Sequence, residues 1–231
     1  MHAARTALLL TLLGSLLPWP LASADAERTL APVYARFLLR RPGHASEPLV
    51  LVRTSDRVEY RYGARQTFEV WRRDARGGLE HVKAFAREGK LVRYTDGDLR
   101  SISLVPSWPS LASLIDRDTL SAGAKRRPAG RFQGERAEWL TGRLGASAVR
   151  VAWLPEIGLP ARLELSGSAT SVRLELLELA PCSAELCAAS DEQALTSIDF
   201  ADLGDREHDP FVRRFLAQEH AHSSALVQHV H

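Results

Sequence analysis

The chain has 231 residues, and its 30 lysines and arginines nearly balance 28 aspartates and glutamates, which gives a formal net charge of +2. This balance argues against a dedicated nucleic-acid-binding protein, which would carry a clustered basic face. If an N-terminal leader is removed, the remaining length suits one domain with a sizeable core and is short for two.

The first 26 residues predict a secretory signal peptide. Met1 to Arg5 form a short positive start, Thr6 to Leu17 form an apolar run, and Ala22 to Ala26 supply small residues for cleavage. The apolar run is shorter than the roughly 20 residues that a membrane-spanning helix needs. We therefore expect an exported mature chain that does not span a membrane.

The mature chain begins with a pattern that predicts a helix over Thr29 to Leu39. Apolar residues recur there at the i, i+3, i+4, i+7 and i+8 positions of a one-faced helix. These residues are Leu30, Val33, Tyr34, Phe37 and Leu38.

After this segment the hydrophobic period changes from 3.6 to 2, which predicts strands. The expected strands are Leu49 to Val52, Val58 to Tyr62, Thr67 to Arg73, Leu79 to Phe85, Leu91 to Tyr94 and Leu99 to Leu104. Pro106 to Pro109 then break the sheet, and Ser110 is expected to cap a short helix.

The second half of the chain returns to strands after a predicted basic surface loop over Gly123 to Gly130, which carries Lys125, Arg126 and Arg127. The expected strands are Arg131 to Thr141, Ala148 to Leu154, Ala161 to Gly167 and Ser171 to Leu179. Asp209 and Pro210 predict the start of a C-terminal helix, with aspartate as cap and proline in the first turn.

Cys182 and Cys187 lie in an expected loop that runs to Gln193. An exported protein meets an oxidising compartment, so their spacing favours a local disulfide. Two free thiols and a redox or metal role are the alternatives.

Five of the eight histidines lie in the last twenty-four residues. His220 and His222, and likewise His229 and His231, form two His-x-His pairs whose imidazoles would share one side of an extended chain. Such a tail could bind zinc, copper or nickel, and a solvated tail without a ligand is the alternative.

An acidic run precedes the C-terminal helix, at Asp199, Asp202, Asp205, Glu207 and Asp209. Its spacing lacks the order of an EF-hand loop. Solvated carboxylates with a helix cap explain it more simply than a calcium site, and a docking surface for a basic partner is a further interpretation.

Together these elements predict an α+β fold with a single curved antiparallel sheet, a half-open β-barrel, covered by the N-terminal, middle and C-terminal helices. The signal peptide occupies residues 1–26, the domain residues 27–216 and a His-rich flexible tail residues 217–231.

The order of elements resembles the LolA, LolB and RseB half-barrel proteins of the Gram-negative envelope, over roughly residues 29–180. Beyond the leader and the expected first helix, the resemblance is carried by Phe68 to Trp71, Leu91 to Tyr94, Val151 to Pro155 and Gly158 to Leu163. It implies a periplasmic protein whose concave sheet holds a lipid or lipoprotein acyl chain, with envelope proteins as further partners.

Five aromatic residues are candidates to line such a cavity, with ordinary core packing as the alternative. They are Phe68, Trp71, Tyr94, Trp139 and Trp153. Strand alternation places Phe68 and Trp71 on opposite faces. No nucleophile elbow, zinc-protease motif or P-loop is present, so we expect a non-enzymatic protein without a cofactor. Metal binding by the tail and a pure protein-interaction module are the alternative functions.

Overall fold

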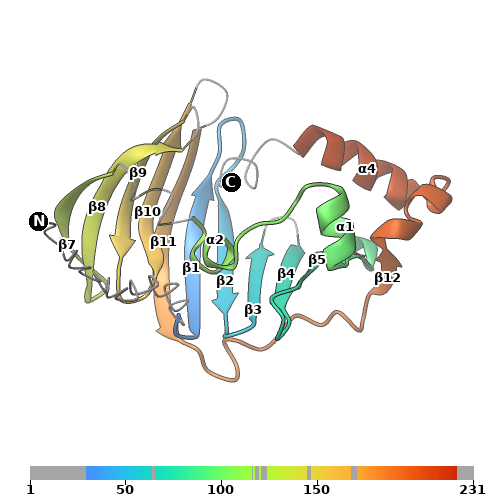
Figure 1. Cartoon of the computed structure of the whole chain (residues 1–231), viewed down its shortest axis with the longest axis horizontal. Helices are drawn as coiled ribbons and strands as arrows, with labels where there is room; N and C mark the ends of the chain where they lie inside the picture. Colours follow the sequence, from blue (N-terminus) through green and yellow to red (C-terminus); the bar gives the residue numbers. More distant parts are fainter. Residues whose placement is uncertain are drawn as a thin grey trace, which may run out of the picture.

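The computed structural model describes residues 30–63, 66–115, 117, 120, 124–144, 147–167 and 171–222. The predicted signal peptide lies outside these residues. Twelve strands form one unclosed sheet in the order β12-β6-β5-β4-β3-β2-β1-β11-β10-β9-β8-β7. All neighbouring strands are antiparallel except β12 and β6, and Figure 1 shows the curvature of the sheet. The expected single, mostly antiparallel sheet is confirmed.

The strands are β1 Val33–Arg40, β2 Glu47–Arg53, β3 Arg57–Tyr62, β4 Thr67–Arg73, β5 Leu79–Phe85, β6 Lys90–Tyr94, β7 Lys125–Phe132, β8 Glu135–Leu144, β9 Ser147–Leu154, β10 Leu159–Ser166, β11 Ser171–Pro181 and β12 Thr196–Asp199. The helices are α1 Asp96–Ser101, α2 Trp108–Ser113 and α4 Pro210–His222, with 3-10 turns η1 Ala86–Glu88, η2 Phe200–Asp202 and η3 Gly204–Arg206.

The predicted N-terminal helix is wrong, because this segment forms β1 in the middle of the sheet. β1 pairs with β2 on one side and with β11 on the other, so its backbone groups are satisfied between strands. Alternate residues are buried, from Val33 to Leu39. Apolar residues also occupy most of the intervening positions, which is why the segment matches a helical period equally well.

The predicted strand over Leu99 to Leu104 is also wrong, since helix α1 begins at Asp96. The Thr95 side chain accepts a hydrogen bond from the Asp98 backbone N–H, and Asp98 accepts one from the Thr95 N–H. This reciprocal capping box outweighs the strand pattern. Only Leu99 is buried in this helix.

The middle and C-terminal helices are present. Helix α2 begins at Trp108 and is capped by Ser107, three residues before the expected cap. Helix α4 begins at Pro210, and an Asp209 carboxylate oxygen accepts a hydrogen bond of 2.8 Å from the Phe211 N–H. It continues to His222 and so includes the first part of the predicted tail.

The predicted basic loop is wrong, because Lys125 to Phe132 form the exposed edge strand β7. β7 pairs with β8 through a turn at Gln133 and Gly134, both with positive φ. This turn divides the single strand that was expected over Arg131 to Thr141. Charged residues and a central proline are common protections of an edge strand against pairing with another chain.

The two faces of the sheet have separate coverings. The face toward α1, α2 and α4, called the inner face, forms the largest hydrophobic cluster together with residues such as Leu99, Leu111 and Phe211. The opposite, outer face carries two smaller clusters, one around Val82 and one around Leu154. Among the described residues, no helix has both the length and the apolarity to cross a membrane.

Candidate functional site

The inner face holds an apolar cavity between the sheet and helix α2, with a volume of about 100 Å³. Its apolar lining comes from β1, β2, β4, β10, β11 and the α2 region, at Leu39, Leu49, Trp71, Pro106, Leu111, Leu114, Leu163, Val172 and Leu174. Its polar lining residues are Tyr60, Tyr62, Glu69 and Ser110. The cavity is smaller than the roughly 300–1,000 Å³ pockets that enclose drug-sized ligands.

Strand alternation places these side chains on the inner face. Glu69 and Trp71 are two residues apart on β4, so both project to the same side. Tyr60 lies directly opposite Glu69 on the neighbouring strand β3. The wall of the cavity therefore brings together a carboxylate, a phenol and an indole.

Helix α2 forms the roof of the cavity and is tied to the sheet by two buried side chains. The Tyr60 hydroxyl donates to the Leu111 carbonyl. Burial, followed by the negative charge of Glu69, raises the pKa of Tyr60 well above its usual value, so the hydroxyl keeps this proton. Arg53 donates a 2.7 Å hydrogen bond to the Ala112 carbonyl.

Arg53 joins α2 to two other segments. Its guanidinium also donates to the carbonyls of Ile157 at 2.7 Å, of Ala31 at 3.0 Å and of Gly158 at 3.4 Å. The residue is 1% exposed, and burial lowers its pKa to about 10. A buried cation held by carbonyls is costly to lose, because each carbonyl would then lack a donor.

The roof segment carries a left-handed backbone residue on each side of α2. Ser103 has φ of 58° and Leu114 has φ of 64°. This region costs a non-glycine residue roughly 1–2 kcal/mol, and Leu114 itself lines the cavity. Two exposed apolar residues, Ile102 at 44% and Val105 at 52%, lie in the same connection.

A stack of aromatic rings lies beside Trp71 and Glu69. The His81 ring lies 3.9 Å from the Trp71 ring at an angle of 8°, and 5.2 Å from the Tyr94 ring. Tyr94 stacks in turn on Phe200, with centroids 4.7 Å apart. His81 is 5% exposed, and its Nε2 lies 3.5 Å from the Glu69 carboxylate.

Glu69 is ionised in this setting. Burial acts to raise its pKa, but the nearby His81 imidazole and the charge of Lys83 outweigh burial, so that the pKa lies below its usual value. The Glu69 side chain is 19% exposed. The cavity therefore presents a carboxylate oxygen within a largely apolar wall.

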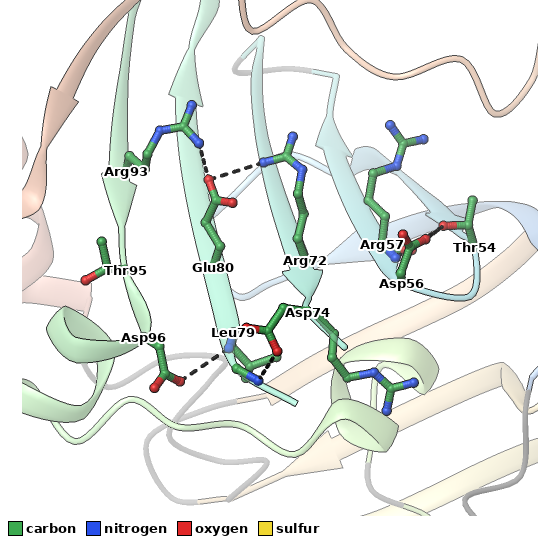
Figure 2. A pocket seen from close by; sticks show the side chains of 12 residues that line it. Thr54, Asp56, Arg57, Arg72, Asp74, Leu79, Glu80, Arg93, Thr95 and Asp96 are labelled. Carbon is green, nitrogen blue, oxygen red and sulfur yellow. Dashed lines mark hydrogen bonds and ion pairs between the residues drawn. The ribbon is translucent and has the colours of Figure 1, made fainter. Parts of the chain in front are cut away.

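A second, polar groove lies beside the ends of β4 to β6, with a volume of about 600 Å³ (Figure 2). Its charged side chains are engaged with one another. Arg72 and Arg93 both pair with Glu80, Asp96 accepts from the Leu79 N–H at 3.3 Å, and Asp74 closes its own turn. We interpret this groove as a structural network.

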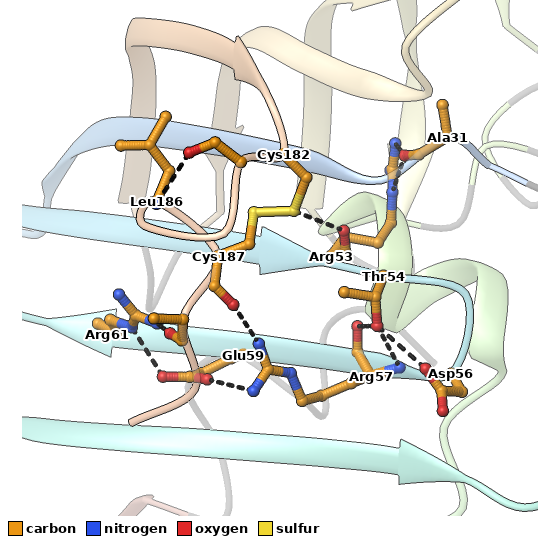
Figure 3. Close-up of a disulfide and its surroundings, with 12 residues drawn as sticks. Ala31, Arg53, Thr54, Asp56, Arg57, Glu59, Arg61, Cys182, Leu186 and Cys187 are labelled. Carbon is orange, nitrogen blue, oxygen red and sulfur yellow. Dashed lines mark hydrogen bonds and ion pairs between the residues drawn. A yellow bond between two sulfur atoms is a disulfide. The ribbon is translucent and has the colours of Figure 1, made fainter. Parts of the chain in front are cut away.

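The segment after β11, residues 182–195, forms a strap that crosses the sheet to reach β12. The expected disulfide between Cys182 and Cys187 is present. Figure 3 shows the anchor beside it, where Glu59 is fully buried between Arg57 and Arg61. Ser190 of the strap donates to the same carboxylate.

The five aromatic candidates are divided between the two faces. Trp71 lines the cavity, Tyr94 belongs to the adjoining stack, and Trp153 is buried elsewhere in the inner-face cluster. Phe68 packs in an outer-face cluster, and Trp139 lies on the outer face with the Arg150 guanidinium 4.1 Å from its ring centroid. Phe68 and Trp71 thus lie on opposite faces, as strand alternation predicts.

The candidate metal ligands fall largely outside the described residues. His229 and His231 lie beyond residue 222, and for His220 and His222 only the backbone, within α4, is described. Within the described ranges, no group of three or more His, Cys, Asp or Glu side chains could hold a metal ion. Asp209, at the end of the acidic run, pairs with Lys90 and caps α4.

Sequence reasoning missed Tyr60, Glu69, Arg53 and the roof residues of the cavity. One signal was present for Glu69, which is an acidic residue two positions before Trp71 and lies between two apolar residues. Alternation assigns it to the same face as that tryptophan. The roof could not be found in this way, because it depends on where α2 lies against the sheet.

No family model matches this sequence, and a search of curated proteins finds no significant match. Among solved structures, an uncharacterized conserved protein from Thermus thermophilus is similar with a TM-score of 0.45 and 14% identity, over 73% of this chain and 90% of that one. PNGF-II gives a TM-score of 0.40 and 12% identity, over 76% of this chain and 32% of its own.

The Pseudomonas aeruginosa MucA/MucB complex gives a TM-score of 0.37 and 13% identity, over 72% of this chain and 58% of that chain. MucB belongs with RseB, one of the proteins that the sequence pattern resembles. This chain thus spans little more than half of that structure and about a third of PNGF-II.

Proposed function

We propose that the chain is an exported, non-enzymatic protein of the Gram-negative envelope that binds an apolar ligand group, such as an acyl chain, in the inner-face cavity. The observation that carries the proposal is the cavity itself, which nine apolar residues line between the sheet and α2. Burial of a methylene group there contributes roughly 0.8 kcal/mol, so a chain of a few carbons supplies useful affinity.

Binding of a longer chain requires helix α2 to move away from the sheet, since the cavity holds about 100 Å³. The two left-handed residues that flank α2 suit such a motion, because strain at Ser103 and Leu114 is relieved when the segment rearranges. The protein then acts as a carrier or a sensor, according to whether the ligand is passed on or changes a partner contact.

The test measures saturable binding of a neutral fluorescent probe, N-phenyl-1-naphthylamine, to the purified protein. Leu174→Trp fills the cavity from β11 and should abolish saturable probe binding. The matched control is Leu177→Trp on the same strand, where the side chain is 42% exposed, and it should bind as the unmodified protein does. Leu114→Ala enlarges the cavity and should retain binding.

Thermal melts of all the variants separate loss of binding from loss of folding. Equal probe binding by Leu174→Trp and Leu177→Trp, with both folded, would place the ligand elsewhere and end the proposal. Transition-metal binding by the His-rich tail and docking of envelope proteins remain predictions from the sequence.

A further inference from the structure

The described side chains that line the cavity include a negative charge and no positive one. Among the described residues that line it, Glu69 is the single carboxylate, and none is a lysine, arginine or histidine. The two residues that lower the pKa of this carboxylate, His81 and Lys83, belong to β5 and lie outside the lining. A negatively charged ligand group would therefore meet a carboxylate and no cationic partner among these lining residues.

Two hydroxyl groups that line the cavity already donate hydrogen bonds to backbone carbonyls. The Tyr60 hydroxyl donates to the Leu111 carbonyl, and the Ser110 hydroxyl donates to the Ser107 carbonyl at 2.8 Å. Tyr62, the remaining hydroxyl of the lining, also has an interaction of its own. The cavity thus offers a strong acceptor at Glu69, while the hydroxyls of Tyr60 and Ser110 donate to backbone carbonyls.

The carboxylate lies on the same wall of the cavity as apolar side chains. Glu69 and Trp71 share the inner face of β4, and the Trp71 ring is fixed by its stacking on His81 at 3.9 Å. The apolar residues Leu39, Leu49 and Leu174 complete the walls. A polar group on a chain that lies against these walls can therefore come next to the carboxylate.

We infer that the cavity selects neutral amphiphiles that carry an O–H or N–H donor on an apolar chain, with Glu69 as the acceptor, and that it rejects free fatty-acid carboxylates. This inference rests on the proposed function and names the class of ligand for the same site. A hydrogen bond to an ionised acceptor is stronger than one between neutral groups. A buried pair of carboxylates without a cation is repulsive.

The test compares three probes of similar length on the full-length mature protein at neutral pH, by displacement of N-phenyl-1-naphthylamine. 1-Decanol carries a donor, methyl nonanoate is neutral with acceptors only, and decanoate is an anion. We expect 1-decanol to bind at least tenfold more tightly than decanoate, with methyl nonanoate between them. Glu69→Gln should strengthen decanoate binding at least fivefold. It should therefore narrow the difference in affinity between 1-decanol and decanoate.

Glu175→Gln is the matched control, because Glu175 lies on β11 with a side chain that is 43% exposed and paired with Arg162. This substitution should leave the order of the three affinities, and the ratios between them, unchanged. Glu69→Asp keeps the charge and should keep the discrimination. If Glu69→Gln does not fold, the order of the three probe affinities on the unmodified protein tests the inference by itself.

The outcomes separate this inference from the proposed function. Equal binding of 1-decanol and decanoate, or discrimination that persists unchanged in folded Glu69→Gln, would overturn the inference and leave an apolar site in place. Failure of all three probes to displace the dye would overturn the proposed function as well.

Discussion

The imidazole of His81 lies flat against the indole of Trp71, with ring centroids 3.9 Å apart and planes 8° apart. Because the two residues are directly opposite each other on β5 and β4, the contact fixes the pair across the strands. It also places His81 Nε2 3.5 Å from the carboxylate of Glu69. The stack thereby positions the acidic group of the cavity.

Replacing His81 with phenylalanine should keep the stack and remove a partner of Glu69. The pKa of Glu69 is lowered in the folded protein, so its ionisation stabilises the fold above the usual carboxyl pKa and this stability is lost as pH falls through the folded value. His81→Phe removes a group that lowers this pKa, while burial still acts to raise it. The pKa of Glu69 should therefore be higher in the variant than in the unmodified protein.

The unfolding free energy of His81→Phe should consequently rise less between about pH 3 and about pH 7 than that of the unmodified protein. Urea unfolding across this range measures the difference. Identical pH profiles for the two proteins would show that His81 does not support the charge of Glu69.

Arg53 should contribute strongly to stability through its bonds to the carbonyls of Ala112 and Ile157. We expect Arg53→Met to lower the unfolding free energy by about 3 kcal/mol, because buried carbonyls lose their donor. Amide hydrogen exchange in α2 should also become faster. Arg40→Met, at an exposed position of β1, is the control and should change stability by less than about 0.5 kcal/mol.

The sequence predicted the sheet better than its helical covering. Strands such as β4 and β5 were located correctly, because their apolar residues pack on both faces of the sheet, Trp71 and Leu79 in the inner cluster and Phe68 and Val82 in an outer one. β1 was misassigned, since Tyr34 and Leu38 are apolar at positions between its buried residues, so the segment also matches a helical period. α1 was misassigned because a local capping box at Thr95 and Asp98 decides it.

The cavity was predictable only in part, since strand alternation indicates which side chains share a face and not what covers them. Trp71 was identified from its residue type, whereas the roof at Leu111 and Leu114 depends on contacts between distant segments. The parallel strand β12 was missed for the same reason. Its pairing with β6 needs the strap to cross the sheet, and its four residues carry no period of their own.

Glu59 should hold the strap in place. Its carboxylate is fully buried and pairs with Arg61 at 2.7 Å and with Arg57, so Glu59→Gln leaves two half-buried cations without their partner. We expect a loss of about 3 kcal/mol and faster hydrogen exchange over residues 182–195. Glu175→Gln breaks an exposed pair instead and should cost less than about 1 kcal/mol. Equal effects of the two substitutions would contradict this role.

The disulfide between Cys182 and Cys187 should contribute modestly. It closes a loop of a few residues, and chain entropy then accounts for about 2 kcal/mol or less. The double variant Cys182→Ser and Cys187→Ser should therefore stay folded, with the strap held by Glu59 and Arg57. Urea unfolding measures the loss, and a loss above about 4 kcal/mol would show that the disulfide organises more than its own loop.

The most direct measurement is a titration of the protein with 1-decanol, followed by NMR of its leucine and valine methyl groups. Binding in the inner-face cavity predicts saturable shifts of the methyl groups of Leu111, Leu114, Val172 and Leu174, with little change at the exposed Leu177 or at Leu154, which packs on the outer face. Absence of saturable shifts at the cavity, or shifts confined to the outer face, would contradict the account.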